Sequence, residues 1–141
     1  LRSEIILNTA GVSGTGTTSS RIKRFANVEK SVGKAITLIQ SATGGDTFTI
    51  NETGIYTASY SDFQSAAAAF GISINLTAED TVNLISISAS NRLCVVSMPN
   101  DTTGFCQWTG ELSAGDVLRA HTGNSTTSIS LATRFYIAKL L

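Results

Sequence analysis

Apolar and polar side chains alternate in short runs along most of the chain. Between residues 46 and 60, Phe48 and Ile50 alternate with threonines, a polar turn follows at 51–54, and alternation then resumes up to Tyr60. Period-two alternation places successive side chains on opposite faces of a strand, while Asn and Gly favour reversals. We therefore predict a hairpin of two short strands over residues 46–60.

The same alternation recurs about every ten residues. It predicts further strands near residues 21–28, 34–40, 70–76, 82–88, 92–98, 104–110, 117–122 and 128–140. In the turn at 41–46, Gly44 and Gly45 supply positive φ angles. The alanine-rich segment 61–69 is too short for an independent helix, so we expect a loop or one helical turn. Nine or ten short strands without βαβ alternation predict an all-β jelly-roll sandwich of antiparallel strands.

The first twenty residues follow a different pattern. The apolar triplet 5–7 predicts a short strand or the end of a stalk, and residues 11–20 have the Gly/Ser/Thr composition of a linker. Glycines at 11, 14 and 16 are spaced as in a phosphate loop, but the flanking strand and helix are missing from the pattern. We expect residues 1–20 to be an N-terminal strand, linker or stalk end, and residues 21–141 to be the jelly-roll domain.

Three segments resemble the sequence motifs of C1q/TNF-like jelly-roll domains. They are Phe48-x-Ile50 with Gly54-Ile55-Tyr56, then Leu112 to Val117 (LSAGDV), and finally Arg134 to Ala138 (RFYIA). The likeness covers about Arg21 to Leu141. Domains of this family form trimeric heads on collagen-like stalks, phage fibres and bacterial spore-surface filaments. The resemblance therefore implies a homotrimer, with Tyr56, Phe135 and Tyr136 on strands that meet at the three-fold axis.

Composition narrows the function classes. Only 14% of the 141 residues are charged, 42% are hydrophobic, and the formal net charge is zero. A chain of this composition is expected to fold, and its surface would carry few charges. Because a weakly charged surface is poorly soluble, we expect part of it to be buried against copies of the same chain. Nucleic-acid binding is not expected, because the one local basic cluster (Arg21, Lys23, Arg24) is interleaved with apolar residues, as in a half-exposed strand. No apolar run approaches the ~20 residues needed to cross a bilayer.

Side chains that could carry catalysis are few. His121 is the single histidine, and its position predicts a surface or interface residue, since a histidine base needs an orienting carboxylate and a nucleophile. The carboxylate pairs Asp46/Glu52 and Glu111/Asp116 could suggest the paired acids of a glycosidase, but both pairs flank predicted turns, where acids are common. We expect a protein that is not an enzyme.

Two cysteines and one histidine provide no zinc-ligand spacing, so we expect neither a metal centre nor a cofactor. The family resemblance raises calcium as an alternative. Its ligands would come from the acidic loop positions Glu79, Asp80 and Asp101, which are more simply read as solvated loop acids.

The two cysteines flank a turn at residues 98–103. In a hairpin centred on Asn100, positions whose numbers sum to 200 are opposed, so Cys94 would face Cys106 and Arg92 would face Trp108. The hypothesis is a pair of adjacent thiols or a disulfide, together with a cation–π contact. A one-residue bulge would separate the thiols.

We expect a non-enzymatic protein of a virion surface (fibre or capsid exterior) or, alternatively, of a bacterial cell or spore surface. It would be a trimeric head that binds a host-surface glycan or protein. Contacts are expected on distal loops. The candidate positions are Asn51, Glu52, Thr53, Glu79, Asp80, Asn83, Asn100, Asp101, Thr102, Asn124, Ser125 and Thr126. A structural trimer that decorates a capsid or caps a stalk, and a glycan-hydrolysing appendage domain, remain alternatives.

Overall fold

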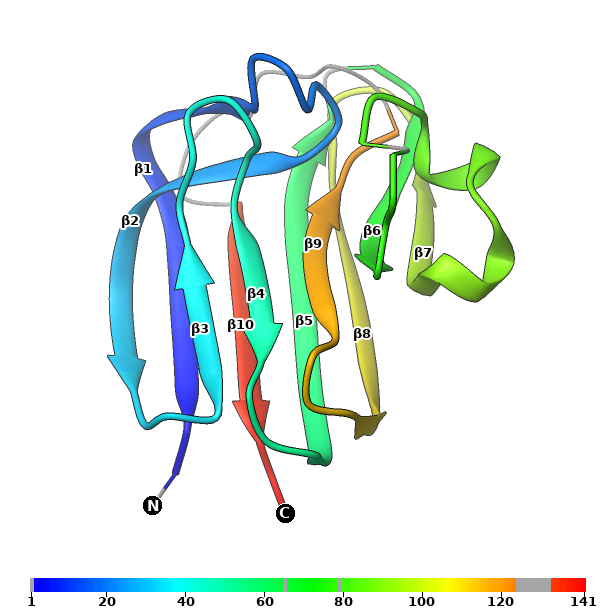
Figure 1. The fold of residues 1–141 in the computed structure, drawn as a ribbon. Helices are drawn as coiled ribbons and strands as arrows, with labels where there is room; N and C mark the ends of the chain where they lie inside the picture. Colours follow the sequence, from blue (N-terminus) through cyan, green and yellow to red (C-terminus); the bar gives the residue numbers. More distant parts are fainter. Residues whose placement is uncertain (1, 65, 79, 124–132) are drawn as a thin grey trace.

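Backbone hydrogen bonds join ten strands into two five-stranded sheets in the computed structural model, which describes residues 2–64, 66–78, 80–123 and 133–141 (Figure 1). The strands are β1 (Glu4–Thr15), β2 (Lys23–Val32), β3 (Ile36–Ile39), β4 (Thr47–Ile50), β5 (Gly54–Gln64), β6 (Ala68–Ile74), β7 (Arg92–Met98), β8 (Thr102–Leu112), β9 (Val117–His121) and β10 (Arg134–Lys139). Every pairing between them is antiparallel. The predicted jelly roll of about ten antiparallel strands is confirmed.

The chain passes repeatedly between the two sheets. Sheet A has the strand order β2-β1-β10-β5-β8, and sheet B has the order β3-β4-β9-β6-β7. In Figure 1, strands β3, β4 and β9 of sheet B lie in front of sheet A. Because neighbouring strands are mostly distant in sequence, the hydrophobic core between the sheets is built from long-range contacts.

Aromatic rings from both sheets meet in that core. Phe48 of sheet B stacks on Phe135 of sheet A, with ring centroids 4.2 Å apart and an interplanar angle of 10°. Tyr60 of sheet A meets Phe70 of sheet B edge-on at 5.1 Å. All four side chains are fully buried. Such contacts add about 0.5–1.5 kcal/mol each to the burial term, and they hold the two sheets in register.

The predicted hairpin over residues 46–60 is wrong in its pairing, although both strands exist. Strand β4 pairs with β3 and β9, while β5 pairs with β10 and β8 in the opposite sheet. Phe48 and Tyr56 bury their side chains in the same core from opposite sides. Alternation identifies the buried face of a strand but not the sheet to which the strand belongs.

The linker expected at residues 11–20 is also wrong over its first part, because β1 continues to Thr15. β1 lies between β2 and β10, so residues 4–15 are an integral part of sheet A rather than an appendage. Ile5 and Leu7 are fully buried in the core. Glycine is depleted in strands, so the backbone pairing of this segment outweighs its glycine-rich composition.

A strand predicted at 82–88 is replaced by a single 3₁₀ turn, η1 (Leu84–Ser86). Leu84 and Ile87 are buried while Ile85 is 57% exposed, which is a spacing of three and not of two. A second 3₁₀ turn, η2 (Ala89–Asn91), leads into β7. The alanine run instead begins β6 at Ala68. In the turn before β4, Gly45 has the predicted positive φ, at 74°, whereas Gly44 does not have one.

Candidate functional site

The outer face of sheet A presents its side chains in registered rows. The central row consists of Lys30, Ile6, Tyr136, Ser59 and Gln107, one from each of the five strands. The flanking rows are Val32, Glu4, Ala138, Thr57 and Thr109 on one side, and Asn27, Asn8, Arg134, Ser61 and Phe105 on the other. The middle of this face is therefore made of hydroxyl, small and aromatic side chains.

A shallow depression of about 290 Å³ lies in this face, lined by Ile6, Ser59, Ser61, Phe105, Arg134 and Tyr136. Phe105 is 58% exposed, which is unusual for a phenylalanine on a folded surface. Short serine side chains beside Tyr136 leave space that an apolar group from outside can fill. This arrangement is typical of a surface that packs against another protein.

Charges on the same face are paired with each other. The guanidinium of Arg134 contacts the Glu29 carboxylate at 2.5 Å, and the amide of Asn8 also donates to Glu29. That donation, followed by the contact with Arg134, lowers the pKa of Glu29. Arg2 and Lys30 likewise pair with Glu4, Lys30 at 3.5 Å. Pairing reduces the cost of bringing this face against another surface.

Two of the three predicted trimer-interface residues are misplaced. Tyr56 and Phe135 are fully buried between the sheets, because each lies at an inward position of its strand. They cannot offer surface to a second chain. Tyr136 points to the outer face of sheet A, so its role in an interface stays a prediction.

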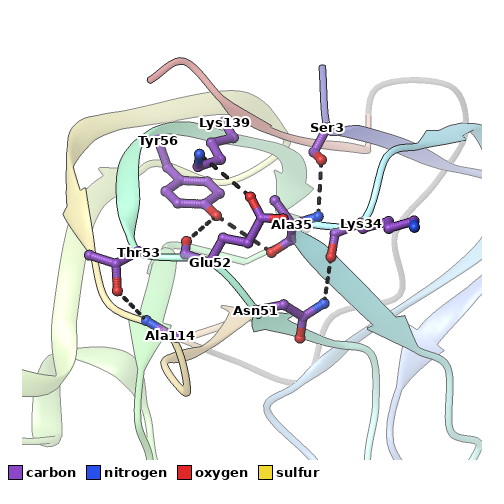
Figure 2. Close-up of polar contacts among 9 residues, drawn as sticks. All are labelled: Ser3, Lys34, Ala35, Asn51, Glu52, Thr53, Tyr56, Ala114 and Lys139. Carbon is purple, nitrogen blue, oxygen red and sulfur yellow. Dashed lines mark hydrogen bonds and ion pairs between the residues drawn. The ribbon is translucent and has the colours of Figure 1, made fainter. Parts of the chain in front are cut away.

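The loop between β4 and β5 is held by internal contacts (Figure 2). The Tyr56 hydroxyl donates to the backbone carbonyl of Glu52 at 2.6 Å, and the Glu52 carboxylate lies 3.6 Å from the Lys139 ammonium. Burial is the main reason that the pKa of Tyr56 is raised. The backbone N–H of Ile55 donates to the Leu141 carbonyl at 3.0 Å. The loop is therefore tied to the end of the sandwich at which both chain ends lie (Figure 1).

Two more predicted binding residues also make internal hydrogen bonds in this loop. The Asn51 amide donates to the carbonyl of Lys34 and to the Thr37 hydroxyl, each at 2.8 Å. The Thr53 hydroxyl accepts from the backbone N–H of Ala114 at 3.0 Å. These side chains join the β2–β3 and β8–β9 connections to the loop, which is a structural use of the polar groups.

The turn between β7 and β8 lies at the other end of the molecule. Gly54 pairs with Leu112 and Gln64 pairs with Thr102, so the two loops flank opposite ends of one long ladder, about 33 Å apart. In this turn Asn100 accepts from the backbone N–H of Ala67 at 2.7 Å. Asp101 is exposed and has a φ of 51°. Thr102 donates to the Asn100 carbonyl at 2.9 Å.

The remaining loop candidates are only partly described. The Asp80 carboxylate accepts from the Ser19 hydroxyl at 2.5 Å, and the Asp80 carbonyl accepts from the backbone N–H of Arg21 at 3.0 Å. Asn83 precedes η1, and its side-chain oxygen is buried without a hydrogen-bond partner in the described structure. The other predicted positions, Glu79, Asn124, Ser125 and Thr126, lie outside the described residues.

His121 is buried, so the expectation of a surface or interface histidine is wrong. Its Nε2 donates to the Val82 carbonyl at 2.6 Å, and its Nδ1 lies 3.1 Å from the Ser73 hydroxyl, which donates to it in this tautomer. Burial is the largest cause of the lowered pKa of His121. Ser73 is also fully buried, so no substrate can reach the Ser73–His121 pair.

Two of the four acidic residues in the predicted pairs have structural contacts of their own. Asp46 is buried and accepts from the backbone N–H of Phe25 at 2.9 Å, whereas Glu52 is exposed beyond the far end of β4. The four residues of β4 lie between them and span about 13 Å, which is beyond the ~5–10 Å that a glycosidase mechanism uses. Asp116 accepts from the backbone N–H of Ser113 at 2.9 Å and so closes its own turn. Within the described ranges, no group of three or more acidic, histidine or cysteine residues is placed to hold a metal ion.

Cys94 and Cys106 are adjacent, with their sulfur atoms 2.8 Å apart, and both are free thiols. The adjacency was expected, but the hairpin from which it was derived is wrong. β7 pairs with β6 in sheet B and β8 pairs with β5 in sheet A, so the thiols meet across the core. The same separation removes the ladder position that would place Arg92 opposite Trp108.

Comparison with known proteins supports the fold and not a function. No family model and no curated protein matches the sequence. Among solved structures, the chain is similar to murine APRIL at pH 8.0, with a TM-score of 0.68 and 15% identity over 99% of this chain and 100% of that one. It is also similar to Eiger TNF from S. frugiperda, with a TM-score of 0.60 and 16% identity over 99% and 93% of the two chains. For GITRL from bushbaby the TM-score is 0.53, with 13% identity over 97% and 94%.

Among the described residues, no helix has the length and apolar character needed to span a membrane. At the identities given above, the likeness to solved structures establishes the architecture alone. The chain has a TNF-like jelly-roll fold.

Proposed function

We propose that this chain is a non-enzymatic head domain of a surface projection, on a virion or on a bacterial cell or spore. In this proposal it assembles as a homotrimer and binds a host-surface glycan or protein. The observation that carries the proposal is the outer face of sheet A. It combines the hydroxyl side chains of β5 (Thr57, Ser59 and Ser61) with the exposed ring of Phe105 and the half-buried ring of Tyr136.

The size of that face suits assembly. Five strands about 4.8 Å apart and about nine residues long make a surface of about 24 by 30 Å, or about 700 Å². This area is close to the about 800 Å² that each partner buries in a stable protein–protein interface. The resemblance of the sequence to C1q/TNF-like modules favours three copies over two.

Ligand binding is assigned to the loops away from the chain ends. The Asn51–Thr53 loop lies beside both termini, and its side chains are engaged by Lys34, Ala114 and Lys139. The turn at Asn100–Thr103 instead leaves the Asp101 side chain exposed at the opposite end. Asn, Asp and Thr side chains suit the hydroxyl groups of sugars, which they can bind as donors and acceptors.

A glycan array probed with the purified chain tests the binding assignment. We expect signal with the natural chain, loss of that signal when residues 100–103 are replaced by Gly and Ser, and retention in a Glu52→Gln control at the other end. Unchanged signal in the loop variant would contradict the assignment to this loop.

A structural role without a receptor is the second candidate. It is favoured by the internal hydrogen bonds of Asn51 and Thr53. These bonds hold the β4–β5 loop, at the end of the sandwich near both termini, against neighbouring connections of the same chain. Such a trimer would decorate a capsid or cap a stalk. A folded trimer that binds no glycan or host-surface protein is the result this alternative predicts.

A further inference from the structure

Four polar side chains are fully buried at the end of the sandwich where β5 finishes and β10 begins. They are Lys23 at the start of β2, Tyr60 and Asp62 on β5, and Thr133 just before β10. Tyr60 packs edge-on against both Phe25 and Phe70, so the surroundings are aromatic. An amine and a carboxyl group are thus enclosed together in a water-excluded part of the core.

Lys23 has Asp62 as its ion-pair partner, with Nζ 3.2 Å from Oδ2. Within the described structure, Nζ makes no hydrogen bond of ordinary geometry. Burial lowers the pKa of Lys23, and the nearby Asp62 carboxylate opposes that effect. Enclosure therefore favours the neutral amine, which is the nucleophilic form of lysine.

The two oxygens of the Asp62 carboxyl group have different environments. Oδ1 receives two hydrogen bonds, from the backbone N–H of Phe63 at 2.8 Å and from the Thr133 hydroxyl at 2.7 Å. Oδ2 faces Lys23 and accepts a hydrogen bond from the Tyr60 hydroxyl. Two fixed donors on one oxygen are the arrangement that stabilises negative charge during addition to a carbonyl carbon. The other oxygen is placed to leave.

We propose that Lys23 and Asp62 react with each other to form an intramolecular amide bond between β2 and β5. A proton first passes from Nζ to Oδ2, which gives a neutral amine and a neutral carboxylic acid. The Nζ lone pair then attacks Cγ, and the displaced electron pair collects on Oδ1, between Phe63 N–H and the Thr133 hydroxyl. The Cγ–Oδ2 bond breaks as Oδ2 takes a second proton from the nitrogen and departs as water.

The reaction consumes no oxidant and no co-reactant, because its only products are the amide and one water molecule. It also removes two charges from a site where both are costly to hold. β2 and β5 are separated in sheet A by β1 and β10, so the bond joins strands that share no ladder. This modification is independent of the proposed assembly and binding.

Intact-mass spectrometry of the purified, denatured chain tests the proposal directly. We expect a mass lower than that of the sequence by one water molecule, and a branched peptide joining the Lys23 and Asp62 segments after proteolysis. Lys23→Arg is the matched control, since it keeps the positive charge but removes the amine, and we expect it to have its full sequence mass. Asp62→Asn should form the same amide with loss of ammonia and so reach the mass of the natural product.

A natural chain at its full sequence mass would overturn the proposal and leave Lys23 and Asp62 as a buried ion pair. Loss of water that persists in Lys23→Arg would overturn it as well, because it would assign the dehydration to another reaction. The measurement reads covalent structure in the denatured state, so it does not depend on how stable a variant is.

Discussion

At the scale of single residues, the most informative polar groups are those that the fold has enclosed. His121 is the single histidine of the chain, and it is held neutral between the Val82 carbonyl and the Ser73 hydroxyl. Burial lowers its pKa and the neighbouring cations Arg119 and Arg21 add to the effect, while the hydrogen bond to the Val82 carbonyl and the Asp80 carboxylate oppose it. A histidine that must stay neutral in the folded state makes stability depend on pH.

We expect the free energy of unfolding to fall as the pH drops below about 6.5, by at most about 1.4 kcal/mol per pH unit. In that range the unfolded chain binds a proton at His121 while the folded chain resists it. The contribution is therefore present above the unfolded pKa and is lost in acid. Urea unfolding at a series of pH values measures the effect, and His121→Gln should remove it.

Asp46 provides a contribution of opposite sign. Burial raises its pKa despite the hydrogen bond from the Phe25 N–H, so the stability it contributes is lost as the pH rises through its folded-state pKa. Because both chains contain Asp46, its effect cancels in the difference between the natural chain and His121→Gln. An identical pH dependence in the two chains would contradict the role given to His121.

The sequence alone predicted which side chains of a strand share a face, but it did not predict which of the two faces is buried at every strand. The inward positions of Phe48 and Ile50 follow from alternation alone, and both are in the core. Tyr56 and Phe135 were expected at an interface, but an aromatic side chain on a strand can face either way. Which way it faces is set by the pairing of its strand, and that information is long-range.

At the scale of elements, the sequence predicted where most strands lie but not which strands pair with each other. Strands β4 and β5 are consecutive and alternating, yet they lie in opposite sheets, as do β7 and β8. Local patterns predict strands well and assign partners poorly, because the partners of each strand come from distant parts of the chain. The internal hydrogen bonds of the predicted loop residues Asn51 and Thr53 were not foreseen for the same reason, since Lys34 and Ala114 are far away in sequence.

The thiols of Cys94 and Cys106 bring two edge strands of different sheets together. The hydrogen bond between the two sulfur atoms is the largest cause of the lowered pKa of Cys94, which favours its thiolate form. Thiolates are the species that attack disulfides. Oxidised glutathione should therefore convert the pair into an intramolecular disulfide that fastens β7 to β8.

We expect this disulfide to raise the free energy of unfolding by about 2–3 kcal/mol, since the closed loop is short. Thiol counting in denaturant before and after oxidation measures bond formation, and Cys94→Ser is the control. Two titratable thiols per natural chain after oxidation would contradict the prediction.

At the scale of the whole molecule, the outer face of sheet A is the surface through which copies are proposed to meet. Ser59 lies at the middle of that face, beside Tyr136 in the central row. Replacing Ser59 with Arg would place an unpaired cation in the centre of a closed interface, which is costly to bury. We expect the variant to be a monomer with the fold intact.

Ser97→Arg is the matched control, because Ser97 is an exposed serine on β7 of sheet B. It should assemble as the natural chain does. Sedimentation of both variants, with circular dichroism to confirm folding, distinguishes loss of assembly from loss of structure. Equal assembly by Ser59→Arg and Ser97→Arg would move the interface away from sheet A.

Light scattering coupled to size-exclusion chromatography tests the central claim most directly, because a trimeric head must exist as a trimer before it can present its loops. For the natural chain at micromolar concentration, the account predicts a single species with three times the 14.8 kDa chain mass. A species with the mass of one chain would contradict it.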